Sequence, residues 1–316
     1  MIDSLKHFIY RFKYVYGREI PLSKPVDVSL ELASYCTNSC GYCYFSDRKN
    51  LPFKSGFMDT DLALRIIDDA AAIGVHSLKF NYRGESTMHP DFEKITRHAK
   101  NLAGGSTFIE RLTNSNFNFK PDRDDILRGL LNQTKVKVSF DSFIKEIFEA
   151  QRKGSKYERT LANIDKFYHY PKRKTELVIQ SVRTMQNKDE DLEAEIKRRW
   201  PSATASIRDV VSGRVDKDLS KVVVKDRDFS NRQSCIQAHV RLIVRHDGLV
   251  GPCCPDISGK LTLGDAKRET LREIFGSQAA KNLRRDLKLK SAFEKSPCKS
   301  CSSFESFKSY KAPWNS

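Results

Sequence analysis

The sequence predicts an α/β fold in which a parallel sheet, covered by helices on its outer face, is closed or partly closed as a barrel. Six segments with a strand pattern alternate with helical segments, at intervals of about 30 residues, over roughly the first two thirds of the chain. The 316 residues suffice for one large α/β domain with an appendage or for two ordinary domains. A hydrophobic fraction of 39% and a charged fraction of 30% are typical of a soluble globular protein.

Each predicted unit begins with a strand and continues into a helix. The first strand is expected at 26–33, and its helix at 58–74, with an N-cap at Asp59 or Thr60 and a stop at Gly74. The later strands are expected at 76–82, 107–114, 136–142, 176–184 and 204–211, and the later helices at 90–103, 124–131, 157–170 and 191–200. Such a sheet places functional groups in the loops that follow its strands.

We expect three segments along the chain: a helix in residues 1–24, the barrel in 25–215 and an extension in 216–316. In the first segment one helical face carries apolar side chains, namely Leu5, Phe8, Ile9, Phe12 and Val15. This pattern predicts a helix that packs against the barrel, with a helix lying on a membrane surface as the alternative. Residues 281–290 (KNLRRDLKLK) predict another helix, with a basic face.

The formal net charge of +16 is large for this length and has several possible meanings. It suits a solvated surface, an anionic substrate, an acidic protein partner or nucleic acid. No apolar run approaches the roughly 20 residues that span a bilayer, and the N-terminal residues lack a signal-peptide pattern. We therefore expect no transmembrane segment and a cytoplasmic location, where thiols stay reduced and clustered cysteines bind metal or do chemistry.

Three of the eight cysteines lie in one loop directly after the first predicted strand. Cys36, Cys40 and Cys43 have CxxxCxxC spacing. Three thiolates this close can bind three irons of a cubane cluster and leave the fourth iron open to another ligand. A structural zinc site needs four ligands, and this loop offers no histidine or fourth cysteine. The spacing therefore favours an iron–sulfur cluster.

This loop, in a six-unit α/β barrel and with Tyr42 just before the last cysteine, resembles that of the radical S-adenosylmethionine (radical SAM) enzymes. The resemblance implies a partial (β/α)6 TIM-like barrel and a 4Fe-4S cluster on the three cysteines. In the family, the open iron binds the amino and carboxylate groups of S-adenosylmethionine. One electron cleaves it to methionine and a 5′-deoxyadenosyl radical, which abstracts hydrogen from an unactivated C–H bond.

The second strand ends in NYRGEST, which is similar to the family's GGE-like turn. Gly84 and Glu85 match that turn, whereas Arg83 replaces its first glycine. The resemblance implies that Glu85 and the nearby backbone bind the ammonium group of S-adenosylmethionine, a suitable role for a carboxylate and a tight turn.

Two further strand ends are similar to family motifs. LTNSN resembles a TNG turn and implies that Asn114 lies near the active-site mouth. VSFDS and the following EAQRKG resemble an SxD and RxG stretch. They imply that Ser139 and Asp141 lie near the ribose and that Arg152 pairs with the methionine carboxylate, because hydroxyls and carboxylates suit ribose and a forked guanidinium suits a carboxylate.

The other five cysteines lie in the last third of the chain: Cys235, Cys253, Cys254, Cys298 and Cys301. Their spacing, the hairpin-like RLIVRHDGLVGPCC and the following LGDAKRETLREIFGS resemble the SPASM and twitch extensions of the family. No cysteine follows Cys301, which favours the one-cluster twitch form. The resemblance implies a second 4Fe-4S cluster on Cys235, Cys253, Cys298 and Cys301, with Cys254 spare or exchanged with Cys253. Zinc on the same four thiolates is the alternative.

These features predict a radical SAM enzyme that acts on a polar or anionic substrate, such as a sugar, aminocyclitol or nucleotide derivative. A fully ligated second cluster suits an oxidation, and a redox-neutral elimination, rearrangement or epimerisation stays open. Arg183, Arg208 and Asp209, near the ends of late strands, are candidates for acid–base groups at the mouth.

Two alternatives differ in substrate or in class. One keeps the chemistry but acts on a macromolecule, either a base in DNA or RNA or a peptide. The other is a non-catalytic protein that binds a cluster or zinc. The resemblance implies a flavodoxin or ferredoxin as the reductant, and a basic surface would attract these acidic proteins.

Overall fold

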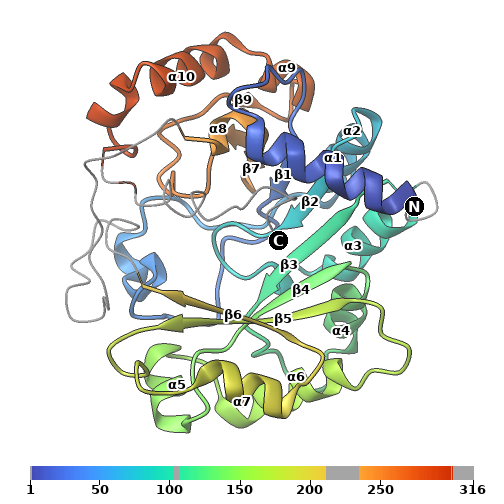
Figure 1. Ribbon diagram of the computed structural model, residues 1–316, viewed down its shortest axis with the longest axis vertical. Helices are drawn as coiled ribbons and strands as arrows, with labels where there is room; N and C mark the ends of the chain where they lie inside the picture. The colour runs from blue at the N-terminus through green and yellow to red at the C-terminus, as the bar shows by residue number, and fades with distance from the viewer. Residues whose placement is uncertain (1, 103–106, 211–234, 300, 302–316) are drawn as a thin grey trace.

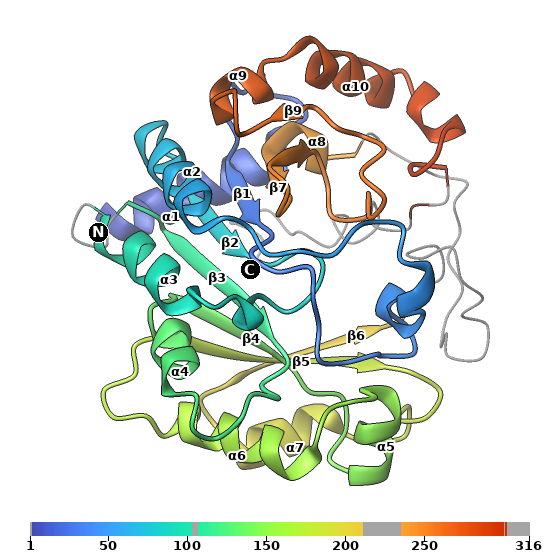
Figure 2. The ribbon, with the colours of Figure 1, turned by 180° about the vertical axis from the view of Figure 1, so that it is seen from behind.

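The computed structural model describes residues 2–102, 107–210, 235–299 and 301. Within these ranges the strands form one nine-stranded sheet in the order β6-β5-β4-β3-β2-β1-β7-β8-β9. Figures 1 and 2 show this sheet as a curved wall, with α2, α3, α4, α6 and α7 along its outer side and the C-terminal elements beyond β1.

The elements of the barrel alternate as the sequence predicts. The strands are β1 (Asp27–Leu30), β2 (Ser77–Phe80), β3 (Glu110–Ser115), β4 (Lys135–Ser139), β5 (Glu176–Arg183) and β6 (Thr204–Asp209). The helices are α1 (Ile2–Tyr16), α2 (Thr60–Ala72), α3 (Phe92–Asn101), α4 (Asp124–Leu131), α5 (Lys145–Gln151), α6 (Tyr157–Tyr168) and α7 (Leu192–Arg199). The sequence reasoning missed α5, which is too short to show a helical period.

Consecutive strands from β1 to β6 pair in parallel. In the part of the chain that the structure describes, β6 pairs with β5 alone and β9 with β8 alone, so the sheet does not close. This confirms the partly closed form of the predicted barrel. A missing closure leaves an open side between the two edge strands.

The C-terminal residues continue the same sheet. Their elements are α8 (Gln237–Val240), β7 (Arg241–Val244), β8 (Leu249–Gly251), β9 (Gly264–Asp265), α9 (Leu271–Phe275) and α10 (Gln278–Lys288). β7 pairs in parallel with β1, from Asp27 opposite Arg241 to Leu30 opposite Val244. β7 and β8 form the predicted hairpin, whose turn contains Gly248 at φ +88°. α10 covers most of the predicted basic helix.

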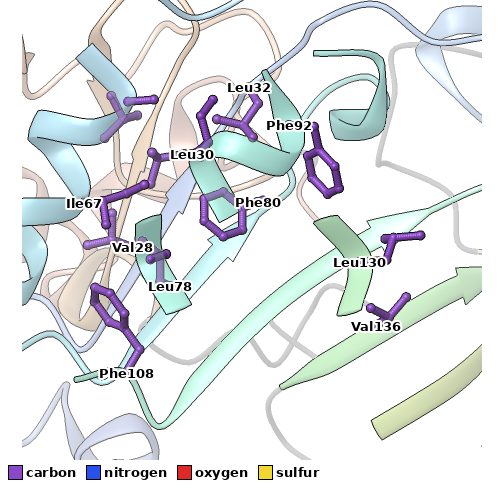
Figure 3. Close-up of a cluster of buried hydrophobic side chains, with 14 of the residues drawn as sticks. Val28, Leu30, Leu32, Ile67, Leu78, Phe80, Phe92, Phe108, Leu130 and Val136 are labelled. Carbon is purple, nitrogen blue, oxygen red and sulfur yellow. The ribbon is translucent and has the colours of Figure 1, made fainter. Parts of the chain in front are cut away.

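Side chains alternate along the strands between a helix-facing core and a concave face. Val136 and Val138 on β4 are fully buried in the main core, and Figure 3 shows Val136 beside Leu130 of α4. Lys135, Lys137 and Ser139 occupy the alternate positions of β4 and are half-buried. On β4 the concave face is therefore polar and the outer face apolar.

Buried charges tie the N-terminal ends of the strands together. Asp27 of β1 is fully buried and forms ion pairs with Lys79 of β2 and, at 3.1 Å, with Arg241 of β7. Burial opposes ionisation, but the two cations hold the pKa of Asp27 below its ordinary value. Arg241 also donates to the Tyr14 hydroxyl at 3.0 Å. The network joins α1 to three neighbouring strands.

Helix α1 packs against the protein through a different face from the one expected. Tyr10 and Tyr14 are buried in a small cluster with Val26, Ile236 and Val240. Four of the five predicted packing residues are instead exposed, with Leu5 at 60% and Ile9 at 37%, and Val15 is half-buried. The reason is chemical, because the tyrosine rings fill apolar space while the Tyr14 hydroxyl reaches Arg241.

Substitutions on the two faces of α1 test which face packs against the protein. We expect Tyr14→Ala to lower the free energy of unfolding by about 3 kcal/mol or more, because it removes a buried ring. The matched change Leu5→Ala, on the exposed face, should alter it by less than about 0.5 kcal/mol. Denaturant unfolding of both variants measures this, and a larger loss for Leu5→Ala would reverse the assignment of the faces.

Candidate active site

The CxxxCxxC loop lies between the C-terminal end of β1 and the start of α2. Cys40 is buried, and Cys36 and Cys43 are half-buried. Burial, with smaller contributions from the neighbouring thiols and, at Cys36, from the Glu85 carboxylate, raises the pKa of Cys36 to about 12 and that of Cys43 to about 11. The thiols therefore need a metal centre to become thiolates.

The spacing of these thiols in one loop suits a cluster better than one ion. Among the described residues, no three His, Cys, Asp or Glu side chains converge closely enough to share a single metal ion. A 4Fe-4S cubane binds each cysteine through a different iron and does not need such convergence. The three thiols, at one loop and near one another, thus fit the cluster that their spacing predicts.

Backbone and side-chain contacts hold the loop in place. Asn38 is buried and donates to Ser155 Oγ at 2.7 Å. Arg48 donates to the carbonyl oxygens of Cys36, at 2.8 Å, and Asn38, at 2.9 Å. Asn116, at the end of β3, donates to Thr37 Oγ1 at 2.9 Å. Sequence reasoning missed Asn116, although it lies in the same LTNSN turn as the predicted Asn114.

Gly84 and Glu85 pack directly against this loop. Gly84 has φ +72°, and a Cβ there would lie 2.4 Å from the Ala33 carbonyl oxygen. The Glu85 side chain is buried and accepts hydrogen bonds from Thr87 Oγ1 at 2.7 Å and from the backbone N–H of Asn116 at 2.8 Å. Burial raises its pKa, and these hydrogen bonds oppose that shift. A cation beside Glu85 would therefore favour its carboxylate form.

Tyr42, Asp141 and Arg152 form one hydrogen-bonded group, in which Asp141 and Arg152 are buried. The Arg152 guanidinium lies 2.9 Å and 2.8 Å from the two carboxylate oxygens of Asp141. Asp141 also accepts hydrogen bonds from the Tyr42 hydroxyl and, at 2.8 Å, from the backbone N–H of Val182. Burial opposes the charge of Arg152, yet Asp141 raises its pKa. In this structure, Asp141 and Arg152 thus bind each other.

The other predicted contacts lie on the concave face. Ser139 ends β4 on that face, in register with Gln180 of β5. Asn114 of β3 lies opposite Lys137, and its Oδ1 is buried without a hydrogen-bond partner among the described residues. By strand alternation, Arg208 shares the concave face. The structure does not bring the other two acid–base candidates there, because Arg183 and Asp209 occupy the alternate positions.

Four cysteines line a second site in the C-terminal region. A pocket of about 370 Å³ is lined by Cys235, Gln237, Cys253, Pro255, Phe293, Pro297, Cys298 and Cys301. Burial raises the pKa of Cys235 to about 12, while the Gln237 and Ala238 amides lower it by donating to its sulfur. Cys254 does not line the pocket, and its Sγ lies 3.5 Å from Gln237 Oε1. Four cysteines around one pocket suit a sulfur-ligated cluster, and a zinc ion on the same four thiolates is the alternative.

Arg83, which replaces a family glycine, connects the two cysteine regions. Its guanidinium is buried and donates to both carboxylate oxygens of Glu31 at 2.6 Å, and to the Ile257 carbonyl at 3.1 Å. His246 of the C-terminal hairpin contacts the same Glu31 at 3.2 Å. Burial opposes the charge of Glu31, but hydrogen bonds from His246 and Arg83 lower its pKa. No sequence signal marked this contact.

Comparisons with known proteins agree with this arrangement. The model of the Radical SAM superfamily matches residues 30–193, and that of the SPASM iron-sulfur cluster-binding domain matches residues 235–302. No curated protein sequence matches the chain. In the described part of the chain, no helix combines the length and apolar character needed to cross a membrane.

Several solved structures share the fold at low sequence identity. BtrN in complex with AdoMet and 2-DOIA is 16% identical, with a TM-score of 0.58 over 88% of this chain and 92% of that chain. Native anSMEcpe with bound AdoMet is 18% identical, with a TM-score of 0.65 over 89% and 88%. Streptococcus suis SuiB bound to precursor peptide SuiA is 15% identical, with a TM-score of 0.65 over 88% and 70%.

The close approach at Gly84 predicts an effect of adding one methyl group. We expect Gly84→Ala to lower the free energy of unfolding by about 2 kcal/mol or more, because φ is positive and the new Cβ meets backbone. The displaced loop should also retain less iron after anaerobic reconstitution. Gly41→Ala is the matched control, since its Cβ meets no heavy atom within 4 Å. Equal stability of both variants would contradict this packing.

Proposed function

Because the chain belongs to the radical SAM superfamily, which consists of enzymes, we propose that it abstracts hydrogen from an unactivated C–H bond of a polar or anionic small molecule. One observation carries the proposal. The cysteine loop, the Gly84–Glu85 turn and the Asp141–Arg152 pair meet at the C-terminal ends of β1, β2 and β4. In parallel α/β sheets that edge is where active sites form.

Radical SAM and SPASM domains bind 4Fe-4S clusters and S-adenosylmethionine, and we assign the first cluster to Cys36, Cys40 and Cys43. When bound, the clusters carry single electrons, and S-adenosylmethionine supplies a 5′-deoxyadenosyl radical. The buried thiols fit this group because they lie together in one loop. The contacts of Asn38, Arg48 and Asn116 hold this loop in place.

The surrounding side chains have separate roles in binding S-adenosylmethionine. Glu85 faces the cysteine loop, where its carboxylate can bind an ammonium group. Ser139 can donate to a ribose hydroxyl from the concave face. The Asp141–Arg152 pair presents opposite charges beside Tyr42. A ribose hydroxyl can replace one of the hydrogen bonds that Asp141 accepts, and a methionine carboxylate can replace the one that Arg152 donates.

We assign a second cluster to Cys235, Cys253, Cys298 and Cys301, which all line one pocket. Four thiolates leave no iron open to substrate. A one-electron carrier with no open position suits an oxidation, in which the substrate loses a hydrogen atom and then an electron and a proton. Arg208 is the predicted acid–base candidate that lies on the concave face.

The small-molecule substrate is preferred because Lys135 and Lys137 on the concave face of β4 are half-buried. BtrN is solved with 2-DOIA, whereas SuiB is solved with a precursor peptide, so the fold itself accommodates either class. The net charge of +16 also suits an acidic flavodoxin or ferredoxin as reductant. Such docking should weaken as salt rises.

Cleavage of S-adenosylmethionine tests the proposal directly. Anaerobically reconstituted protein should form 5′-deoxyadenosine when dithionite is added, and the triple variant Cys36→Ala/Cys40→Ala/Cys43→Ala should form none. The triple variant should still contain about four irons per chain, because the second site is intact. Chromatography of the products measures this. Equal 5′-deoxyadenosine formation by the triple variant would overturn the assignment of the first cluster.

The neighbouring cysteines of the second site provide a matched pair. We expect Cys253→Ala to reduce the iron content from about eight to about four per chain, or nearly so, because one of four ligands is lost. Cys254→Ala should leave it unchanged, since that thiol contacts Gln237 and does not line the pocket. Measuring the iron, sulfide and zinc content of both variants tests which cysteine is a ligand. Zinc in place of iron would establish the structural alternative.

A further inference from the structure

The concave face carries lysines that differ in how their charge is balanced. Near the N-terminal ends of the strands, Lys79 pairs with Asp27, and Lys135 lies 3.5 Å from Glu110 and 3.1 Å from Glu176. These cations are neutralised within the protein and serve its stability. The next lysine along β4 toward the active-site end is Lys137.

Lys137 has no such partner. Within the ranges that the structure describes, no carboxylate forms an ion pair with it or with Arg208 of β6. Burial, together with the positive charges of Arg208, Lys79 and Lys135, lowers the pKa of Lys137 to about 8, and the Glu110 carboxylate opposes this shift. A half-buried ammonium beside a guanidinium is unfavourable unless an anion compensates it.

Both side chains face the same space. On β4, Val136 and Val138 point into the helix-facing core, so Lys137 points to the concave face. On β6, Ala205 and Ile207 pack against the same core, so Arg208 points to the concave face too. Lys137 lies one pleat, about 7 Å, from Ser139, on the side away from the cysteine loop.

Asn114 adds a neutral polar group to this position. It is the register partner of Lys137 on β3, and its Oδ1 is buried without a hydrogen-bond partner among the described residues. A buried acceptor without a donor is costly, and a hydroxyl of a ligand would satisfy it. The three side chains together suit a ligand with an oxyanion next to a hydroxyl group.

We propose that Lys137 and Arg208 form a subsite for a phosphate or carboxylate group of the substrate, with Asn114 beside it. The proposal rests on the proposed function and narrows its substrate to oxyanion-bearing small molecules. A planar guanidinium and an ammonium can share the oxygens of one such group. Lys137 lies on the N-terminal side of Ser139 and the exposed Arg208 lies nearer the C-terminal edge of the sheet, so the subsite spans the concave side from β4 to β6.

Chemical labelling of lysines tests the subsite without any radical chemistry. The full-length reconstituted protein is treated briefly with an amine-acylating reagent at pH 8, and the labelled peptides are quantified by mass spectrometry. Because an anion raises the pKa of Lys137 by about one unit or more, inorganic phosphate should slow its labelling about fivefold compared with chloride at equal ionic strength. Acetate in a parallel sample distinguishes a carboxylate subsite from a phosphate subsite.

Matched lysines and variants make the result specific. Labelling of Lys135, whose charge is already paired, should be unchanged by phosphate. Arg208→Gln should abolish the protection of Lys137, whereas Arg198→Gln, an exposed arginine on α7, should retain it. Equal labelling of Lys137 in phosphate, acetate and chloride would overturn the subsite. Since S-adenosylmethionine and reductant are absent, failure of this test leaves the cleavage experiment unaffected.

Discussion

The pairing of β1 with β2 on one side and with β7 on the other determines where both cysteine sites lie. The CxxxCxxC loop leaves the C-terminal end of β1, and the hairpin of the second site begins with β7. The second site is built around the β7–β8 hairpin, with Cys235 before β7 and Cys253 after β8, which runs antiparallel to β7. The C-terminal region is thus a continuation of the barrel wall rather than a separate body on a linker.

Buried charge supports this arrangement at both ends of β1. At one end Asp27 binds Lys79 and Arg241, and at the other Glu31 binds Arg83 and His246. Removing one partner of such a group leaves a buried charge uncompensated and costs several kcal/mol, about 3 to 5. These ion pairs are internal to the fold. They differ from Lys137 and Arg208, which have no carboxylate partner among the described residues and therefore suit a ligand.

Arg83 shows how a departure from a family motif can be accommodated. The glycine that the motif usually has there offers no side chain, whereas Arg83 reaches Glu31 and the Ile257 carbonyl. The adjacent Gly84 keeps its conformational requirement, because a Cβ would meet the backbone of the cysteine loop. The side chain of Arg83 can therefore make a structural contact, whereas the nearby loop restricts position 84 to glycine.

The sequence by itself determined the alternation of strands and helices, the two cysteine groups and the family, because periodicity and short spacings are local properties. Tertiary structure alone decided which side chains meet. It buried Tyr14 rather than Leu5, paired Asp141 with Arg152, excluded Cys254 from the pocket and joined Arg83 to Glu31. These contacts bridge residues on different elements, many of them far apart in sequence, and depend on strand register and burial, which no local pattern encodes.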